Sequence, residues 1–208
     1  MALLHRAELR PSKLDLLTAW LPGRPWFAGT AGADVTRVAG YRFDDPAGEV
    51  GIETILVRAG DGPVLQVPLT YRGAPLADAD RWLVGTTEHS VLGRRWVYDA
   101  AGDPVYQAAL AAAVLDGVGQ AEEYFEVDGR REVRAASMTV RGGRLAGVDA
   151  AGIGAVREVV DAEPTRLVTE RVELALVRRP GTGPAEGGLT GAWPELAQPV
   201  VLAYATPR

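Results

Sequence analysis

Leucines at helical spacing predict a helix near the N-terminus. They run from Leu14 to Leu21 and place one apolar face along the segment. Ser12 is a suitable N-cap, and Asp15, three residues later, completes a capping-box pattern. Pro22 and the glycine after it should end the helix.

A second helix is predicted from Pro104 to Leu115. Asp103 is a suitable N-cap, proline occupies the first helical position, and Gly117 follows the last turn. No residue in this span carries a charge, although apolar residues spread around it. An exposed helix of that composition would leave a large apolar patch, so we expect this helix to be a core element.

Apolar runs predict strands through the rest of the first half. The segment 50–57 is apolar on both faces apart from Glu53 and Thr54, which favours an interior position in a sheet. Asp61-Gly62 marks a hairpin. Pro68 interrupts a period-two strand with one buried face and cannot donate a ladder hydrogen bond, which indicates an edge or a bulge. The predicted strands are 2–9, 35–43, 50–57, 65–71, 82–87 and 91–98.

After Gly119 no strong helix pattern remains. Asp128-Gly129 and Gly142-Gly143 are hairpin signals, and residues 180–191 have the Gly, Pro and Thr content of a loop. The predicted strands are 122–127, 132–141, 153–160, 166–178 and 199–204. The fold class is therefore α+β: a curved, mostly antiparallel sheet with two helices over residues 1–118, followed by a second antiparallel β half over residues 119–208.

Composition limits the function classes. The chain has 208 residues, 47% of them hydrophobic, and a net charge of −5 with a pI of about 5.2, which argues against a nucleic-acid partner. The absence of cysteine excludes disulfides, zinc–thiolate sites and thiol nucleophiles, and two histidines are too few for a multi-histidine metal site. No long apolar run or secretory pattern is present, so we expect a soluble, cytoplasmic protein without a membrane partner.

The motifs of familiar catalytic sites are missing from the sequence. It contains no glycine-rich phosphate loop, no kinase catalytic loop and no G-x-S-x-G elbow. The single lysine, Lys13, falls in the first turn of a predicted helix and not on a strand. His89 and the adjacent Ser90 would point to opposite faces of a strand, so they cannot simply form a catalytic pair. We therefore expect no catalytic residue, no metal site and no cofactor.

Several motifs, in a fixed order, resemble the N-terminal cap domain of actinobacterial maltokinases over about residues 5–115. They are Leu21–Gly29, Gln66–Arg72, Gly85–Asp99 and Asp103–Tyr106. Maltokinases phosphorylate maltose with ATP and magnesium and feed an alpha-glucan pathway from trehalose. In that family the cap precedes a kinase-like N-lobe and a helical C-lobe that holds the catalytic aspartates. The resemblance implies a stand-alone cap-like protein without that C-lobe.

The second half bears a looser resemblance to the kinase N-lobe. Leu174–Gly181 is similar to the family's lysine-bearing strand and the turn after it, with Ala175 at the place of the phosphate-binding lysine. The resemblance therefore implies a degenerate kinase N-lobe that lacks nucleotide chemistry.

The resemblance also draws attention to the Trp26 loop and the 86–90 segment, which we expect to share a functional face. The candidate residues for binding a substrate or partner are Trp26, Thr86, Thr87, Glu88, His89 and Arg94. Alternatively, the threonines and the glutamate cap strand ends and His89 is a structural histidine.

The resemblance implies a non-catalytic accessory or regulatory protein linked to alpha-glucan, trehalose and maltose metabolism. Its partner would be an enzyme of that metabolism or a glycan. Two alternatives stay open, namely a carbohydrate-binding module and a part of a sugar kinase that completes its active site with another chain.

Overall fold

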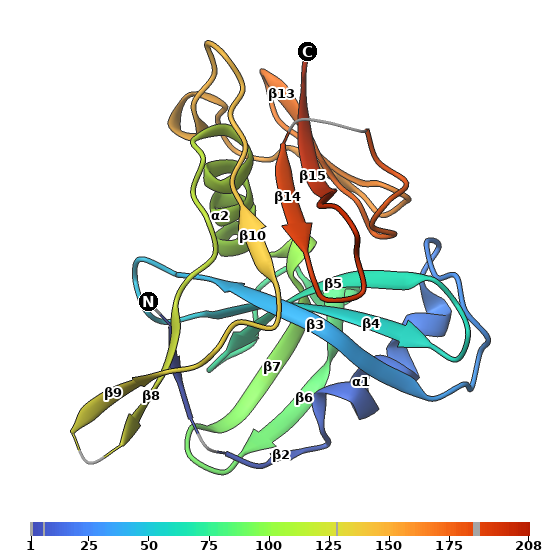
Figure 1. Cartoon of the computed structure of the whole chain (residues 1–208), viewed down its shortest axis with the longest axis vertical. Helices are drawn as coiled ribbons and strands as arrows, with labels where there is room; N and C mark the ends of the chain where they lie inside the picture. Colours follow the sequence, from blue (N-terminus) through green and yellow to red (C-terminus); the bar gives the residue numbers. More distant parts are fainter. Residues whose placement is uncertain (1, 6, 128, 185–187) are drawn as a thin grey trace.

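The computed structural model describes residues 2–5, 7–127, 129–184 and 188–208, and it is mostly β with two α-helices. The strands form two six-stranded sheets and one three-stranded sheet (Figure 1). No helix in the described part of the chain is long and apolar enough to cross a membrane.

The first six-stranded sheet is antiparallel throughout and curls, with β6 and β7 turned away from β3 and β4 (Figure 1). Its strand order is β2-β6-β7-β5-β4-β3. The strands are β2 (Leu9–Arg10), β3 (Val35–Phe43), β4 (Gly51–Ala59), β5 (Val64–Arg72), β6 (Leu83–His89) and β7 (Gly93–Asp99).

Helix α1 (Lys13–Trp20) covers one face of this sheet and contacts β3 and β6. Its N-terminus confirms the predicted capping box, because Ser12 accepts from the backbone of Asp15 while the Asp15 carboxylate accepts from the backbone of Ser12. Leu17 and Leu21 are completely buried against the sheet.

The second six-stranded sheet has the order β10-β14-β15-β13-β12-β11 and is also antiparallel. The strands are β10 (Thr139–Arg141), β11 (Glu158–Val160), β12 (Thr165–Val168), β13 (Val172–Leu176), β14 (Leu189–Ala192) and β15 (Val200–Pro207). Helix α2 (Pro104–Leu115) contacts β15, and its buried residues share one hydrophobic core with residues of both large sheets. The predicted core role of α2 is thus confirmed.

The small sheet connects the N-terminus to the second half of the chain. Strand β1 (Ala2–Leu4) pairs in parallel with β8 (Glu123–Val127), which pairs with β9 (Arg130–Val133). Asp128 of the predicted hairpin lies outside the described residues. The division at residues 118 and 119 stays a prediction, and the β1–β8 pairing crosses it.

Buried polar groups join the two halves. The Gln66 amide nitrogen Nε2 donates to the carbonyls of Val177 at 2.8 Å and Leu202 at 2.9 Å, and the Gln66 backbone N–H donates to the Arg178 carbonyl at 2.7 Å. Gln66 is completely buried, so the expectation of a single buried face for β5 was wrong. The alternation of apolar and polar residues in β5 was misleading because the second half of the chain covers the face of the strand that carries Gln66.

Pro68 lies on an interior strand, in contrast to the expectation of an edge strand. It is opposite Thr54 of β4, but the pairing of β5 with β7 starts only at Leu69. Its missing N–H is therefore tolerated because β7 has already ended at that point.

The second half has shorter strands than predicted. The predicted strand 166–178 is a hairpin of β12 and β13, and the predicted strand 132–141 is divided between β9 and β10. Strand β14 lies partly in the predicted loop 180–191, of which residues 185–187 are outside the described residues. The expected curved antiparallel sheet and the two helices are confirmed, and the fold as a whole is mostly β. No observation tests the degenerate kinase N-lobe, which stays a prediction.

Candidate functional site

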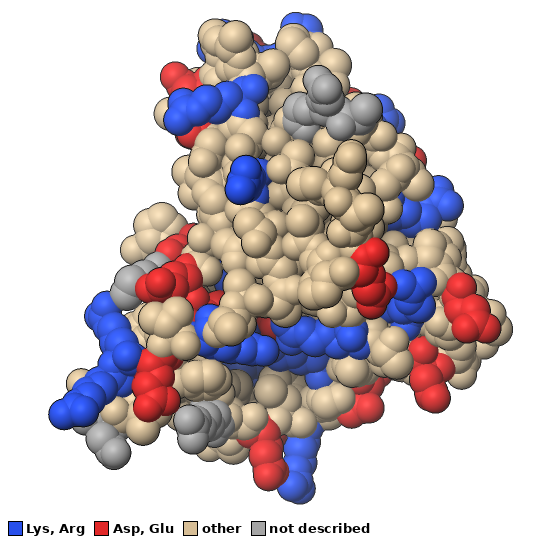
Figure 2. All heavy atoms as spheres, viewed as in Figure 1, with Lys and Arg blue, Asp and Glu red and all other residues tan. Residues whose placement is uncertain are grey.

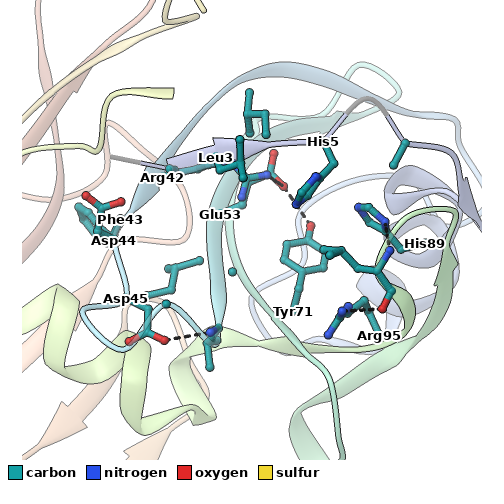
Figure 3. A pocket seen from close by; sticks show the side chains of 18 of the residues that line it. Leu3, His5, Arg42, Phe43, Asp44, Asp45, Glu53, Tyr71, His89 and Arg95 are labelled. Atoms are coloured by element: carbon teal, nitrogen blue, oxygen red, sulfur yellow. Dashed lines mark hydrogen bonds and ion pairs between the residues drawn. The ribbon is translucent and has the colours of Figure 1, made fainter. Parts of the chain in front are cut away.

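A cavity of about 610 Å³ lies between the N-terminal strand and the end of the first sheet (Figure 3). Residues of β1, β3, β4 and β8 line it, together with the β3–β4 turn and the β6–β7 hairpin. The pairing of β1 with β8 therefore forms one wall of the cavity.

Glu53 is the centre of the charged network in the cavity. Its side chain is only 4% exposed, and it contacts Lys13 Nζ closely. Arg42 Nη2 lies 3.1 Å from Glu53 Oε2, and Arg37 Nη1 lies 3.5 Å from Glu53 Oε1. Tyr71 Oη donates to Glu53 Oε2 at 3.1 Å. One buried carboxylate is thus surrounded by three cations and a phenol.

The register of the sheet brings these groups together. Arg42 is directly opposite Glu53 across the β3–β4 pair, while Tyr71 of β5 is two residues beyond Leu69, the partner of Glu53. Arg37 and Arg42 are five residues apart, so a regular strand would place them on opposite faces. A β-bulge between Arg37 and Ala39 shifts the register by one residue, and both arginines reach Glu53.

A glycine makes room for one of these arginines. A Cβ atom at Gly40 would lie 2.7 Å from Arg37 Nη2 and 2.9 Å from the Thr54 carbonyl oxygen. The missing side chain therefore lets the Arg37 guanidinium lie close along β3 on its way to Glu53.

The protonation of the network follows from burial and charge. Burial would raise the pKa of Glu53, but the cations Arg42, Lys13 and Arg37 outweigh it and lower this pKa to about 2. Burial lowers the pKa of Lys13, against the pull of Glu53. Burial and the Glu53 charge raise the pKa of Tyr71 well above its usual value. Near neutral pH, Glu53 is ionised and Tyr71 is a neutral donor.

A second ion pair borders the network. Arg134 Nη1 lies 3.2 Å from Glu123 Oε2, and Arg42 Nε is 3.9 Å from Glu123 Oε1. Arg134 balances the charge of Glu123. The three cations around Glu53 therefore keep an excess of positive charge over that one carboxylate. In Figure 2 a band of basic side chains crosses the middle of the molecule, where Figure 1 shows β3.

Two histidines face each other at the other end of the cavity (Figure 3). The rings of His5 and His89 meet edge to face, with centroids 5.8 Å apart. His89 Nδ1 accepts from the backbone N–H groups of Val91 and Leu92, which assigns the remaining proton of the neutral ring to Nε2. Burial, followed by the charges of His5, Arg95 and Lys13, lowers the pKa of His89.

Carboxylates occupy the β3–β4 turn at the opposite rim. Asp45 accepts hydrogen bonds from the backbone N–H groups of Ala47, Glu49 and Val50, so it stabilises the turn (Figure 3). In the described ranges, no group of three or more His, Cys, Asp or Glu side chains is arranged to hold a metal ion.

The structure separates the two segments that were expected to share a functional face. Trp26 is 2% exposed and belongs to the core beneath α1, and its indole Nε1 donates to Asp161 Oδ1 at 2.7 Å. In Figure 1 the loop after α1 and the β6–β7 turn lie at opposite ends of the first sheet. Trp26 lies in a turn, as expected, but its ring is buried because Trp20, Asp161 and Arg178 contact it.

The other candidates follow the alternation of β6. Thr87 is buried and donates to the Pro11 carbonyl at 2.7 Å, while Thr86 and Glu88 are exposed. Glu88 forms an exposed ion pair with Arg94 at 2.6 Å. Of the six candidates, only His89 lines the described cavity. A binding role for these six residues stays a prediction.

The residues around Glu53 were not predicted as a site from the sequence. One signal was available, because Glu53 is a charged residue within an otherwise apolar segment, which predicts a buried charge that needs partners. The partners could not be read from the sequence, since Lys13, Arg37, Arg42 and Tyr71 come from three different elements.

Comparison with known proteins supports the resemblance to maltokinase caps. Residues 20–103 match the family model described as the maltokinase N-terminal cap domain. No curated protein matches the chain. The matched range includes most of the first sheet and Glu53, whereas Lys13 and the β1 and β8 walls of the cavity lie outside it. Residues 20–103 of this chain are therefore similar to a maltokinase N-terminal cap domain.

Proposed function

We propose that this chain is a non-catalytic, cap-like accessory or regulatory protein of alpha-glucan, trehalose and maltose metabolism, with the cavity around Glu53 as its binding site. The match of residues 20–103 to maltokinase cap domains supports the metabolic assignment. The excess of positive charge on partly exposed side chains in the cavity supports a binding role.

The protonation of this network favours binding over catalysis. A general acid or base works best when its pKa lies near the working pH. Glu53 has a pKa of about 2, and Tyr71 has a pKa well above its usual value, so neither exchanges a proton readily near pH 7. Groups whose protonation state is fixed near pH 7 are suited to holding a ligand in position.

The aromatic residues of the cavity give less support to a carbohydrate-binding module. Sugars stack on exposed ring faces, but Phe43 is only 4% exposed. The Arg131 guanidinium lies 4.9 Å from the centre of the Tyr124 ring, and Lys13 Nζ lies 5.1 Å from the centre of the Tyr71 ring. Cations therefore occupy one face of each of these two tyrosine rings.

A kinase assay tests the non-catalytic role. The purified chain is mixed with ATP, magnesium and maltose, glucose or glucosamine, and we expect no sugar phosphate. Product that increases with the amount of protein and is absent from a mock purification would contradict the proposal. Co-purification from native cells, followed by identification of the bound protein or sugar, tests the accessory role.

A further inference from the structure

We propose that the cavity binds a phosphate monoester, with the phosphate at Lys13, Arg37 and Arg42 and the organic part toward the apolar rim. This inference rests on the binding role of the cavity proposed above.

The charge balance around Glu53 favours an additional anion. Lys13, Arg37 and Arg42 each lie within ion-pair distance of the same carboxylate, so three positive charges face one negative charge. The neighbouring ion pair of Arg134 is neutral and does not remove the excess. A phosphate monoester carries between one and a half and two negative charges near neutral pH, which matches the excess of two.

The two arginines have hydrogen-bonding capacity for this group. Each guanidinium has five N–H donors. The Arg37 side chain is 33% exposed. Among the described residues it contacts one carboxylate, that of Glu53, at 3.5 Å. The Arg42 side chain is 16% exposed and contacts Glu53 and Glu123 at one nitrogen each. The remaining donors suit the oxygens of a phosphate, which arginine binds in a bidentate manner.

The size and lining of the cavity indicate an organic ligand and not the inorganic ion. A volume of about 610 Å³ is in the range of small-molecule sites and is much larger than a phosphate group needs. Leu3 and Leu92 line the cavity and are 41% and 44% exposed. They offer apolar contact to the organic part, beside the Nε2–H of His89.

The carboxylates on the β3–β4 turn restrict where the phosphate can bind. Asp44 and Asp45 line the rim away from the histidines (Figure 3), and Glu49 of the same turn also lines the cavity. Like charges repel an anion from that end, so the phosphate is directed to the arginines of β3.

Titration calorimetry on the full chain tests the inference. The probes are glucose 6-phosphate and adenosine monophosphate, each with its uncharged parent, glucose or adenosine, and inorganic phosphate. We expect at least one ester to bind more tightly than its parent and than inorganic phosphate, and the tighter ester identifies the organic part. Arg37→Gln and Arg42→Gln should each weaken ester binding by about tenfold to a hundredfold, the usual range for hydrogen bonds to charged groups.

A matched variant controls for a general effect of charge. Arg157 pairs with Glu170 on the surface, outside the residues that line the cavity, so Arg157→Gln should leave ester binding unchanged. Glu53→Gln removes the competing carboxylate and should tighten ester binding. Thermal melts test whether each variant is folded. If the Glu53 variant does not fold, Arg37→Gln still tests the inference, because the Arg37 side chain is exposed.

Three results would overturn the inference: no ester binds, each ester binds no more tightly than its uncharged parent, or Arg37→Gln and Arg42→Gln bind as well as Arg157→Gln. Binding of a neutral glycan alone would reject the phosphate site but keep the binding role. Kinase activity of the isolated chain would reject the proposed function, whatever the result for the esters.

Discussion

Two sites in this protein combine arginine with a buried carboxylate, and they differ in charge balance. At the joint between the halves, Arg178 Nη2 donates to both oxygens of Asp99, at 2.7 and 3.0 Å, and both side chains are completely buried. The Arg178 guanidinium also lies over the Trp26 ring, 4.4 Å from its centre. In the cavity, Glu53 has three cationic partners, which keep 16–33% of their side chains exposed.

The difference separates a structural ion pair from the proposed binding site. Burial of charges is costly, so a fully enclosed site needs equal numbers of opposite charges with good geometry. A site with excess charge must remain in contact with solvent or with a ligand. The Arg178–Asp99 pair at the joint is fully enclosed and has balanced charges. The cavity has excess positive charge, and its cations stay partly exposed.

The largest expected effect comes from breaking the joint. Arg178→Met removes the only cation that the described structure places on Asp99 and leaves a buried carboxylate without a counterion. Loss of one partner of a buried pair costs about 3–5 kcal/mol. Denaturant melts at pH 7 measure the change in the free energy of unfolding.

Two variants control this measurement. Arg166→Met disrupts an exposed pair with Glu173 and should cost less than about 1 kcal/mol. The double variant Asp99→Asn/Arg178→Met removes both charges and should recover part of the loss. If the single Arg178 variant is as stable as the Arg166 variant, the joint does not stabilise the fold.

A second change tests the apolar part of the same junction. Leu110 of α2 is completely buried in the core that both halves share. Leu110→Ala should lower the free energy of unfolding by about 2–5 kcal/mol because it leaves a cavity. A loss below about 0.5 kcal/mol in denaturant melts, the usual range for surface changes, would reject the core role. The effect should not depend on salt, in contrast to changes in the charged cavity.

Acid should weaken the cavity network. The pKa of Glu53 is lowered from 4.5 to about 2 by Arg42, Lys13 and Arg37, with Tyr71 as the other partner. A depressed carboxyl pKa stabilises the fold above pH 4.5, and this contribution, up to about 3 kcal/mol, is lost as the pH falls toward 2. Melts between pH 6 and pH 2 measure it.

Glu53→Gln is the control for the acid effect. This variant has no carboxyl group at position 53, so its stability should fall less steeply between pH 5 and pH 2 than that of the unmodified chain. Parallel curves for the two proteins would show that Glu53 is not the responsible group.

The smallest expected effect is the loss of a cation from the cavity. Arg37→Gln removes one of three positive charges around Glu53, and two remain to balance it. We expect the free energy of unfolding to change by less than about 0.5 kcal/mol. A loss comparable to that of Arg178→Met would mean that the cavity is a structural ion cluster like the joint.

Elements with strong local signals were predicted well. The capping box at Ser12 and the Asp103-Pro104 start of α2 depend on neighbouring residues, and both are present. The strand 35–43 agrees with β3 in full. The second half was predicted less well, because short strands such as β14 depend on partners far along the chain.

The candidate site shows the same limit. His89 was identified and lines the cavity, but Trp26 lies in the core because Asp161 and Arg178, more than 130 residues later, surround its indole. The importance of Glu53 was visible only as a charge in an apolar strand.

Local chemistry along the chain thus accounts for the two helices, most strands of the first sheet and the similarity to a maltokinase cap. Long-range contacts account for the site. The bulge that turns Arg37 and Arg42 to one face, the approach of Lys13 and the wall formed by β1 on β8 all depend on register and packing between distant segments. The period of hydrophobic residues reports how a segment meets its own neighbours, whereas the charge balance of a cavity is the sum over segments that meet only in the folded protein.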